Sequence, residues 1–289
     1  MQNFQSFKNN NIINNISFRL FVFEKIILFY LASIVLFVLV FSKPFSNTYY
    51  LILKNFLYGL FLFFTVYMEQ KNSSQLSSFI RFWLPLFLFT FLYRDTGQIV
   101  HLVHKEWFDG ILVSIDRALF GTDLGVWVER FDHPVLNEIF RLGYASYYLL
   151  IIFGAGFHYF RSDRFYYISF MSKVTLAFCL SYITFIIFPV EGPRFFNAHL
   201  FSTNMDGLYF SHVQQGIIHI ASIQGGAFPS SHVAVALIVW QSFYKKHRGL
   251  FIIMSPFITA LIIGTIWGRY HYAIDVVAGI LLAAIIIKN

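Results

Sequence analysis

Long apolar runs constrain the fold of this chain more than any other feature of its sequence. A helix needs about 20 apolar residues to cross a bilayer, and about 17 are tolerated. Only 12% of the residues are charged, whereas soluble domains carry about 25%. The sequence therefore predicts an all-α polytopic membrane protein with about eight transmembrane helices. The predicted spans are residues 24–42, 49–68, 79–94, 137–160, 168–188, 231–245, 250–267 and 271–287.

The basic residues predict how these spans are oriented. They are scattered over the connecting segments, which fits cytoplasmic loops better than a nucleic-acid-binding face. The run Lys245-Lys246-His247-Arg248, between the sixth and seventh spans, is the strongest marker. Because cytoplasmic loops are enriched in Lys and Arg, we predict that both termini are cytoplasmic. The connections 95–136 and 189–230 and the turn 268–271 then face the periplasm or lumen.

The first long connection, residues 95–136, is not a plain linker. Its segments Trp107–Val113 and Val126–Phe131 mix aromatic, aliphatic and charged residues. This mixture is typical of short amphipathic helices that lie in the plane of the membrane interface. We therefore predict an interfacial segment between the third and fourth spans.

Three polar clusters interrupt the apolar sequence, and all lie at predicted outer ends of spans. The first is Pro189–Arg194, the second is Gly225–His232, and the third is Gly268–Asp275. A membrane protein keeps ionisable residues at such positions mainly when they function there. The three clusters together therefore predict one site on the outer face.

The second cluster predicts a helix that starts at the membrane surface. Pro229 ends any preceding helix, and Ser230 or Ser231 is a natural N-cap. The first turn of this helix presents free backbone N–H groups and the positive end of the helix dipole, and both favour a bound anion. His232 lies in that turn, so its imidazole is expected beside the anion.

The third cluster combines an imidazole with a carboxylate. His271 and Asp275 are four residues apart, so a helix presents both on one face. An acid that accepts a hydrogen bond from one ring nitrogen leaves the other nitrogen free to act as a nucleophile or base. Arg194 and Arg269 add forked donors that match phosphate oxygens. These groups predict a phosphoryl-transfer site without a metal.

The motifs, in this order, resemble those of the phosphatidic acid phosphatase type 2 superfamily, and within it the branch that includes inositol-phosphorylceramide synthase-like proteins. Pro229-Ser230-Ser231-His232 is similar to the family's Pro-Ser-Gly-His motif, and His271-Tyr272-Ala273-Ile274-Asp275 matches its His-x-x-x-Asp motif. Two family cations are replaced, because the Lys of the first motif falls on Ile187 and the Arg of the third falls on Thr265. The resemblance covers about residues 103–288.

Two further stretches, Asp116–Gly121 and Tyr144–Tyr148, also resemble that branch. The resemblance implies two parts in the chain. Residues 1–78 form an N-terminal tail and two extra transmembrane helices. Residues 79–289 form a catalytic domain whose six helices resemble the phosphatidic acid phosphatase type 2 bundle, with the interfacial segment 95–136.

The resemblance also implies a role for each site residue. His271 attacks phosphorus and forms a phosphohistidine, Asp275 orients His271, and His232 protonates the leaving oxygen. Neither a metal nor another cofactor is implied. The groups implied to hold the phosphate oxygens are Arg194, Arg269 and the backbone near Ser230 and Ser231.

The function expected from these features is a membrane lipid-phosphate phosphatase on the outer face. Its partners are a lipid phosphate substrate and membrane lipids, and the sequence indicates no nucleic acid and no obligatory protein partner. One alternative is a phosphotransferase that moves a phospho-headgroup to a lipid or sugar alcohol, because hydrolysis and transfer share the first half-reaction. A second alternative is an anion transporter or an inactive scaffold.

Overall fold

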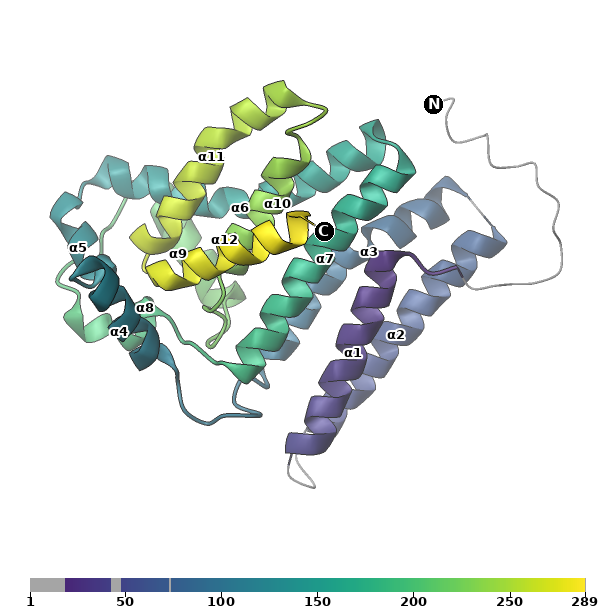
Figure 1. Ribbon diagram of the computed structural model, residues 1–289, viewed down its shortest axis with the longest axis horizontal. Helices are drawn as coiled ribbons and strands as arrows, with labels where there is room; N and C mark the ends of the chain where they lie inside the picture. The colour runs from purple at the N-terminus through teal and green to yellow at the C-terminus, as the bar shows by residue number, and fades with distance from the viewer. Residues whose placement is uncertain (1–18, 43–47, 73, 289) are drawn as a thin grey trace.

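The computed structural model describes residues 19–42, 48–72 and 74–288, so most of the predicted N-terminal tail lies outside the described residues. Within these ranges the chain is helical (Figure 1). Two short 3₁₀ helices, η2 (Val128–Phe131) and η3 (Ala198–Leu200), accompany the α-helices. The α-helices are α1 (Val22–Phe41), α2 (Thr48–Lys71), α3 (Gln75–Gly97), α4 (Asp109–Phe120), α5 (Leu124–Trp127), α6 (Pro134–Arg161), α7 (Arg164–Ile187), α8 (Pro193–Phe196), α9 (Phe210–Ala221), α10 (Ser231–Ser242), α11 (Arg248–Trp267) and α12 (Ala273–Lys288).

The predicted all-α membrane fold is confirmed, but the predicted number of spans needs correction. Six of the described helices, α1, α2, α3, α6, α7 and α11, are long and apolar enough to cross a membrane. The sixth and eighth predicted spans correspond to α10, with 12 residues, and α12, with 16 residues. Helix α10 starts at the predicted residue but ends three residues earlier than predicted. Helix α12 starts two residues later and ends one residue later than predicted, so its length differs from the prediction by one residue.

Helix α10 lies at the centre of the C-terminal bundle. It packs against α6, α7, α11 and α12, and its residues Ala234, Val235 and Ala236 are fully buried. Helix α12 approaches the start of α10 closely at Gly279, where an added Cβ would lie 2.6 Å from the carbonyl oxygen of Ser230. Gly279 therefore fixes the short distance between the two helices that carry the predicted histidines.

The helices outside this bundle are tied to it by a buried ionic cluster. Figure 1 shows α1 and α2 side by side at the edge of the molecule, and α1 packs on α7. Arg81 of α3 bonds Glu24 of α1 (2.7 Å) and Glu69 of α2 (2.8 Å), and Arg164 of α7 bonds Glu69 (2.9 Å). Buried charges need such compensation, so the cluster holds four helices in one arrangement. The division predicted at residue 78 falls in the first turn of α3 and remains a prediction.

The predicted interfacial segment 95–136 contains α4, α5 and η2. One face of α4 is buried and carries Asp109, Leu112, Val113 and Asp116. Its contacts are with the polar loops and the start of α12, so this segment belongs to the site as much as to the bundle. The location of the segment at a membrane interface remains a prediction.

Candidate active site

The three polar clusters of the sequence meet at one end of the bundle. A parallel β-bridge joins Val190 of the first cluster to Gly226 of the second. Backbone hydrogen bonds connect each cluster to another, so the loops form one framework. These bonds run from Ala227 N to Val190 O (3.1 Å), from Arg194 N to Arg269 O (2.8 Å) and from Ser230 N to Asp275 O (3.0 Å).

Two carboxylates of α4 hold this framework in place. Asp109 is fully buried and accepts hydrogen bonds from the amides of Glu191 and Gly192, each at 2.8 Å. Its Oδ1 also accepts from the hydroxyl of Tyr272 at 2.9 Å. The carboxylate thereby joins the loop that leads to Arg194 to the turn beside His271.

Asp116, seven residues later on the same face of α4, binds the start of α12. It accepts hydrogen bonds from the amides of Ala273 (2.7 Å) and Ile274 (3.0 Å). Because these amides lie in the first turn of α12, Asp116 acts as an N-terminal cap supplied by another helix. Burial raises the pKa of Asp116, and the two backbone hydrogen bonds oppose this shift.

His271 is held in one orientation by two acceptors. Its Nδ1 lies 2.8 Å from the carbonyl oxygen of Ala227 and 3.4 Å from Oδ2 of Asp275. The same carboxylate oxygen accepts from the amide of Tyr272 at 2.8 Å. A carbonyl only accepts, so the geometry requires a proton on Nδ1. In the neutral imidazole, Nε2 of His271 then carries the lone pair.

His232 lies next to His271, with 5.7 Å between the ring centroids. Its Nε2 lies 3.0 Å from the hydroxyl of Tyr144, and its ring stacks on Tyr144 and contacts Tyr147. Among the described residues, its buried Nδ1 has no hydrogen-bond partner. The sequence predicted the two histidines at one site, and the structure places them side by side. The sequence did not predict that Tyr144 and Tyr147 contact His232.

A sequence signal for these tyrosines was present in the spacing of the α6 residues. Arg141, Tyr144 and Tyr147 follow one another at intervals of three, which places them on one face of the helix. All three are buried. A face that combines a buried arginine with buried tyrosines in a membrane helix indicates a polar environment inside the bundle.

Of the two caps that the sequence allowed, Ser230 is the N-cap of α10. Its hydroxyl accepts a hydrogen bond from the amide of Val233 at 3.4 Å, and its carbonyl accepts from the amide of Ala234 at 3.0 Å. Among the described residues, the amides of Ser231 and His232 have no acceptor. These two N–H groups are the free donors at this end of the helix.

Arg269 differs from Arg194 in how its guanidinium is used. Arg269 is 8% exposed and donates to Gly125 O (3.2 Å), Thr203 O (2.7 Å) and Glu129 Oε1 (2.6 Å). Burial raises the pKa of Glu129. Hydrogen bonds from residues 202–203 and the charge of Arg269 lower it by more, so the pKa lies below its usual value. Arg269 therefore joins three loops.

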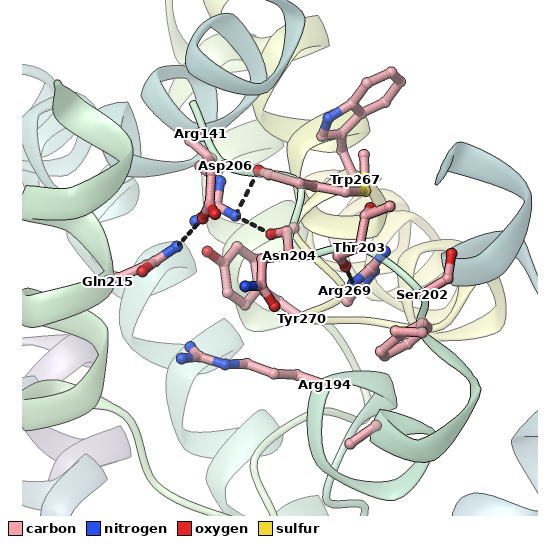
Figure 2. Close-up of a pocket in the computed structure, with 14 residues that line it drawn as sticks. Arg141, Arg194, Ser202, Thr203, Asn204, Asp206, Gln215, Trp267, Arg269 and Tyr270 are labelled. Carbon is pink, nitrogen blue, oxygen red and sulfur yellow. Dashed lines mark hydrogen bonds between the residues drawn. The ribbon is translucent and has the colours of Figure 1, made fainter. Parts of the chain in front are cut away.

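Arg194 is half-buried, and its guanidinium lies over the ring of Phe195, 5.7 Å from the ring centroid. Among the described residues, no acceptor is found for its side-chain N–H groups. It lines a cavity of about 450 Å³ together with Arg141, Arg269 and Tyr270 (Figure 2). Tyr270 also stacks on Tyr144, so the cavity lies directly beside the tyrosine that bonds His232.

The two positions where the family pattern has a cation are occupied differently. Ile187 is the last residue of α7 and is 44% exposed. Thr265 is fully buried, and its carbonyl accepts from the amides of Tyr270 (2.9 Å) and His271 (3.1 Å). Thr265 therefore shapes the turn that carries His271. Within the described part of the chain, no three His, Cys, Asp or Glu side chains are grouped as metal ligands.

We expect substitutions of Arg269 and Arg194 to have different effects on stability and activity. Arg269→Gln leaves the buried carboxylate of Glu129 without its cation and should reduce the free energy of unfolding by about 3–5 kcal/mol. Arg194→Gln should change this free energy by less than about 0.5 kcal/mol while reducing activity. Chemical unfolding in detergent and a phosphate-release assay measure the two effects. Reduced activity of Arg269→Gln at unchanged stability would show that Arg269 acts on the substrate, as the sequence predicted.

Comparisons with known proteins bear on the family of the chain. A sequence model of the PAP2 superfamily matches residues 111–288, more than half of the chain. A PA-phosphatase related-family protein of Dictyostelium discoideum is 28% identical over 99 residues, which cover 33% of this chain and 18% of that relative. No solved structure matches. The inositol-phosphorylceramide synthase-like branch stays a prediction, but the larger assignment is plain: the chain belongs to the PAP2 superfamily.

Proposed function

We propose that this protein is an integral membrane lipid-phosphate phosphatase that works through a phosphohistidine at His271, without a metal. The observation that carries the proposal is the pair of imidazoles. His271 has its Nδ1 bound to Ala227 O and near Asp275, and its ring centroid lies 5.7 Å from that of His232. One imidazole with a fixed tautomer beside a second one supplies both a nucleophile and a proton donor.

The first half-reaction uses both rings. Nε2 of His271 attacks phosphorus, a P–N bond forms, and the P–O bond to the leaving alcohol breaks. His232, which must be protonated once the phosphate is bound, donates its proton to the leaving oxygen. Asp275 and the Ala227 carbonyl stabilise the positive charge that develops on His271.

The second half-reaction returns the site to its starting state. A water molecule attacks phosphorus and transfers a proton to His232, which the first step left neutral. The P–N bond breaks and inorganic phosphate is released. Lone-pair density returns to Nε2 of His271, and His232 is protonated again.

The proposed phosphate contacts are Arg194 and the start of α10. The guanidinium of Arg194 and the free amides of Ser231 and His232 supply donors for the equatorial oxygens. Ser230 contributes by capping the helix that presents these amides. Arg269 acts by holding the segments around the cavity together. Of the proposed phosphate contacts its own is the weakest, because its guanidinium already donates to Gly125, Thr203 and Glu129.

The proposed substrate is a lipid phosphate drawn from the membrane. The site lies at one end of the apolar helices, where a lipid headgroup would be located if its chains lay alongside the bundle. With both termini in the cytoplasm, this end faces the periplasm or lumen. Membrane lipids are then the surroundings of the site, and the reaction needs no protein partner.

One observation favours phosphotransfer as a second candidate. The cavity of about 450 Å³ is lined by both polar and apolar residues, and its Tyr270 stacks on the tyrosine that bonds His232. A headgroup or an acceptor alcohol would have space there. Water needs no such cavity. Both reactions share the phosphohistidine and differ in the group that resolves it.

Turnover by the purified protein tests the proposal. With a panel of lipid phosphates in detergent and no alcohol acceptor, we expect release of inorganic phosphate, and His271→Ala should reduce it by about 10⁴-fold or more. His101→Ala, which changes an exposed imidazole outside the site, is the matched control. Phosphate release only after an alcohol is added would favour transfer. Full activity of His271→Ala would contradict the assignment of the nucleophile.

Asp275→Asn should reduce kcat by less than the loss of an orienting acid that is the only acceptor for its histidine. The Ala227 carbonyl already holds Nδ1 of His271 at 2.8 Å, so Asp275 adds one longer interaction. We expect kcat to fall by about 10- to 100-fold, whereas an orienting acid without such support is worth about 10⁴. Steady-state kinetics measure this change. A loss near 10⁴ in a folded variant would make Asp275 the dominant orienting group.

A further inference from the structure

Arg141 of α6 is a buried cation without a carboxylate partner. It is 7% exposed, and Nη2 donates to the carbonyl oxygens of Asn204 (3.1 Å) and Met205 (2.9 Å). Among the described residues, its buried Nε has no acceptor and its guanidinium forms no ion pair. A buried charge without compensation is costly, and in a membrane helix it marks a functional position by default.

The guanidinium of Arg141 faces the cavity that Arg194 lines. Figure 2 shows the two arginines reaching the cavity on either side of Tyr270. Burial raises the pKa of Tyr270, and the charges of Arg141 and Arg194 oppose this shift, which indicates that both cations lie near its hydroxyl. Two guanidinium groups around one cavity create a strong preference for an anion.

The negative charge that the cavity itself offers is small. Of its lining residues only Asp206 carries a carboxylate, and Oδ1 of Asp206 lies 3.5 Å from Nε2 of Gln215. Arg269, the third arginine of the lining, is compensated by Glu129. The cavity therefore has one uncompensated carboxylate and two uncompensated guanidinium groups, those of Arg141 and Arg194, which gives it a net positive charge.

The cavity is adjacent to the proposed reacting groups. Tyr144 lies one turn beyond Arg141 on α6, and its hydroxyl is 3.0 Å from Nε2 of His232. Tyr270, which lines the cavity, stacks on Tyr144 with 4.2 Å between ring centroids. A molecule that reaches the histidines with one group can therefore occupy the cavity with the next.

We propose that Arg141 is a phosphate-binding residue that acts with Arg194 in this cavity. The inference rests on the proposed function, and it names a residue outside the three sequence motifs. The ligand chemistry is a phosphate oxyanion, either the reacting phosphate or a second phosphate of the substrate. Arg141 positions the substrate through its free guanidinium donors and takes no part in bond formation.

The test measures binding of inorganic phosphate to the purified full-length protein in detergent by titration calorimetry. Arg141→Gln should weaken binding by about 10- to 100-fold, the value of a charge-assisted hydrogen-bond pair. Arg141→Lys, which keeps the charge but not the fork, should give an intermediate affinity. Arg130→Gln is the matched control, because it removes the same charge from an exposed arginine that does not line the cavity.

The outcomes decide the inference without relying on turnover. Unchanged phosphate affinity in folded Arg141→Gln, or no phosphate binding by the wild type, would overturn it. If Arg141→Gln does not fold, an Arg141→Lys variant with wild-type affinity would overturn it as well. The proposed function fails separately, if His271→Ala keeps its turnover while phosphate binding still depends on Arg141.

A comparison of substrates distinguishes the two sources of the phosphate. Arg141→Gln should raise KM for lipid monophosphates and lipid diphosphates alike if Arg141 binds the reacting phosphate. It should raise KM for lipid diphosphates alone if Arg141 binds a second phosphate. Either result supports the inference, whereas an unchanged KM for both substrates in a folded variant would contradict it.

Discussion

The geometry of the site depends on two carboxylates of α4. Asp109 binds the amides of the loop that leads to Arg194, and Asp116 binds the amides that start α12. Both residues lie on one face of a helix, so their spacing fixes the distance between the loop and α12. His271 lies in the turn immediately before α12. These contacts of Asp109 and Asp116 therefore fix the positions of His271 and of the loop that carries Arg194.

The same use of acids extends over this end of the molecule. Glu138 of α6 accepts hydrogen bonds from the amides of Leu208, Phe210 and Ser211, and Glu129 binds residues 202–203 and Arg269. These carboxylates are engaged with backbone amides or with Arg269. Because their charge is compensated in the loops, Arg141 and Arg194 remain the cations that face the cavity. The acids thus hold the loops together, and the cavity keeps a net positive charge.

The sequence predicted the features that periodicity and residue type encode. Apolar runs located the long helices, the helix cap was narrowed to Ser230 or Ser231, and His232 and His271 were expected at one site. The sequence was less informative where the partner of a side chain is a backbone atom or a residue far away in the chain. The carbonyl of Ala227, the closest partner of His271, has no sequence signature. Arg269 was predicted as a phosphate ligand, but its guanidinium binds Gly125 of α5, Glu129 of η2 and Thr203 of a loop. These segments are far from Arg269 in the sequence, and only the fold brings them to it. The length of α10 was overestimated because apolar composition does not mark where a buried helix ends.

The central claim is that His271 carries the phosphoryl group during turnover. The most direct measurement is rapid quenching of the purified protein with a lipid phosphate under conditions that preserve phosphohistidine, followed by mass spectrometry of its peptides. We expect one phosphoryl group on the peptide that contains His271, and none on that peptide in His271→Ala. Steady turnover by the wild type with no phosphorylated His271, or with the label on His232, would contradict this account.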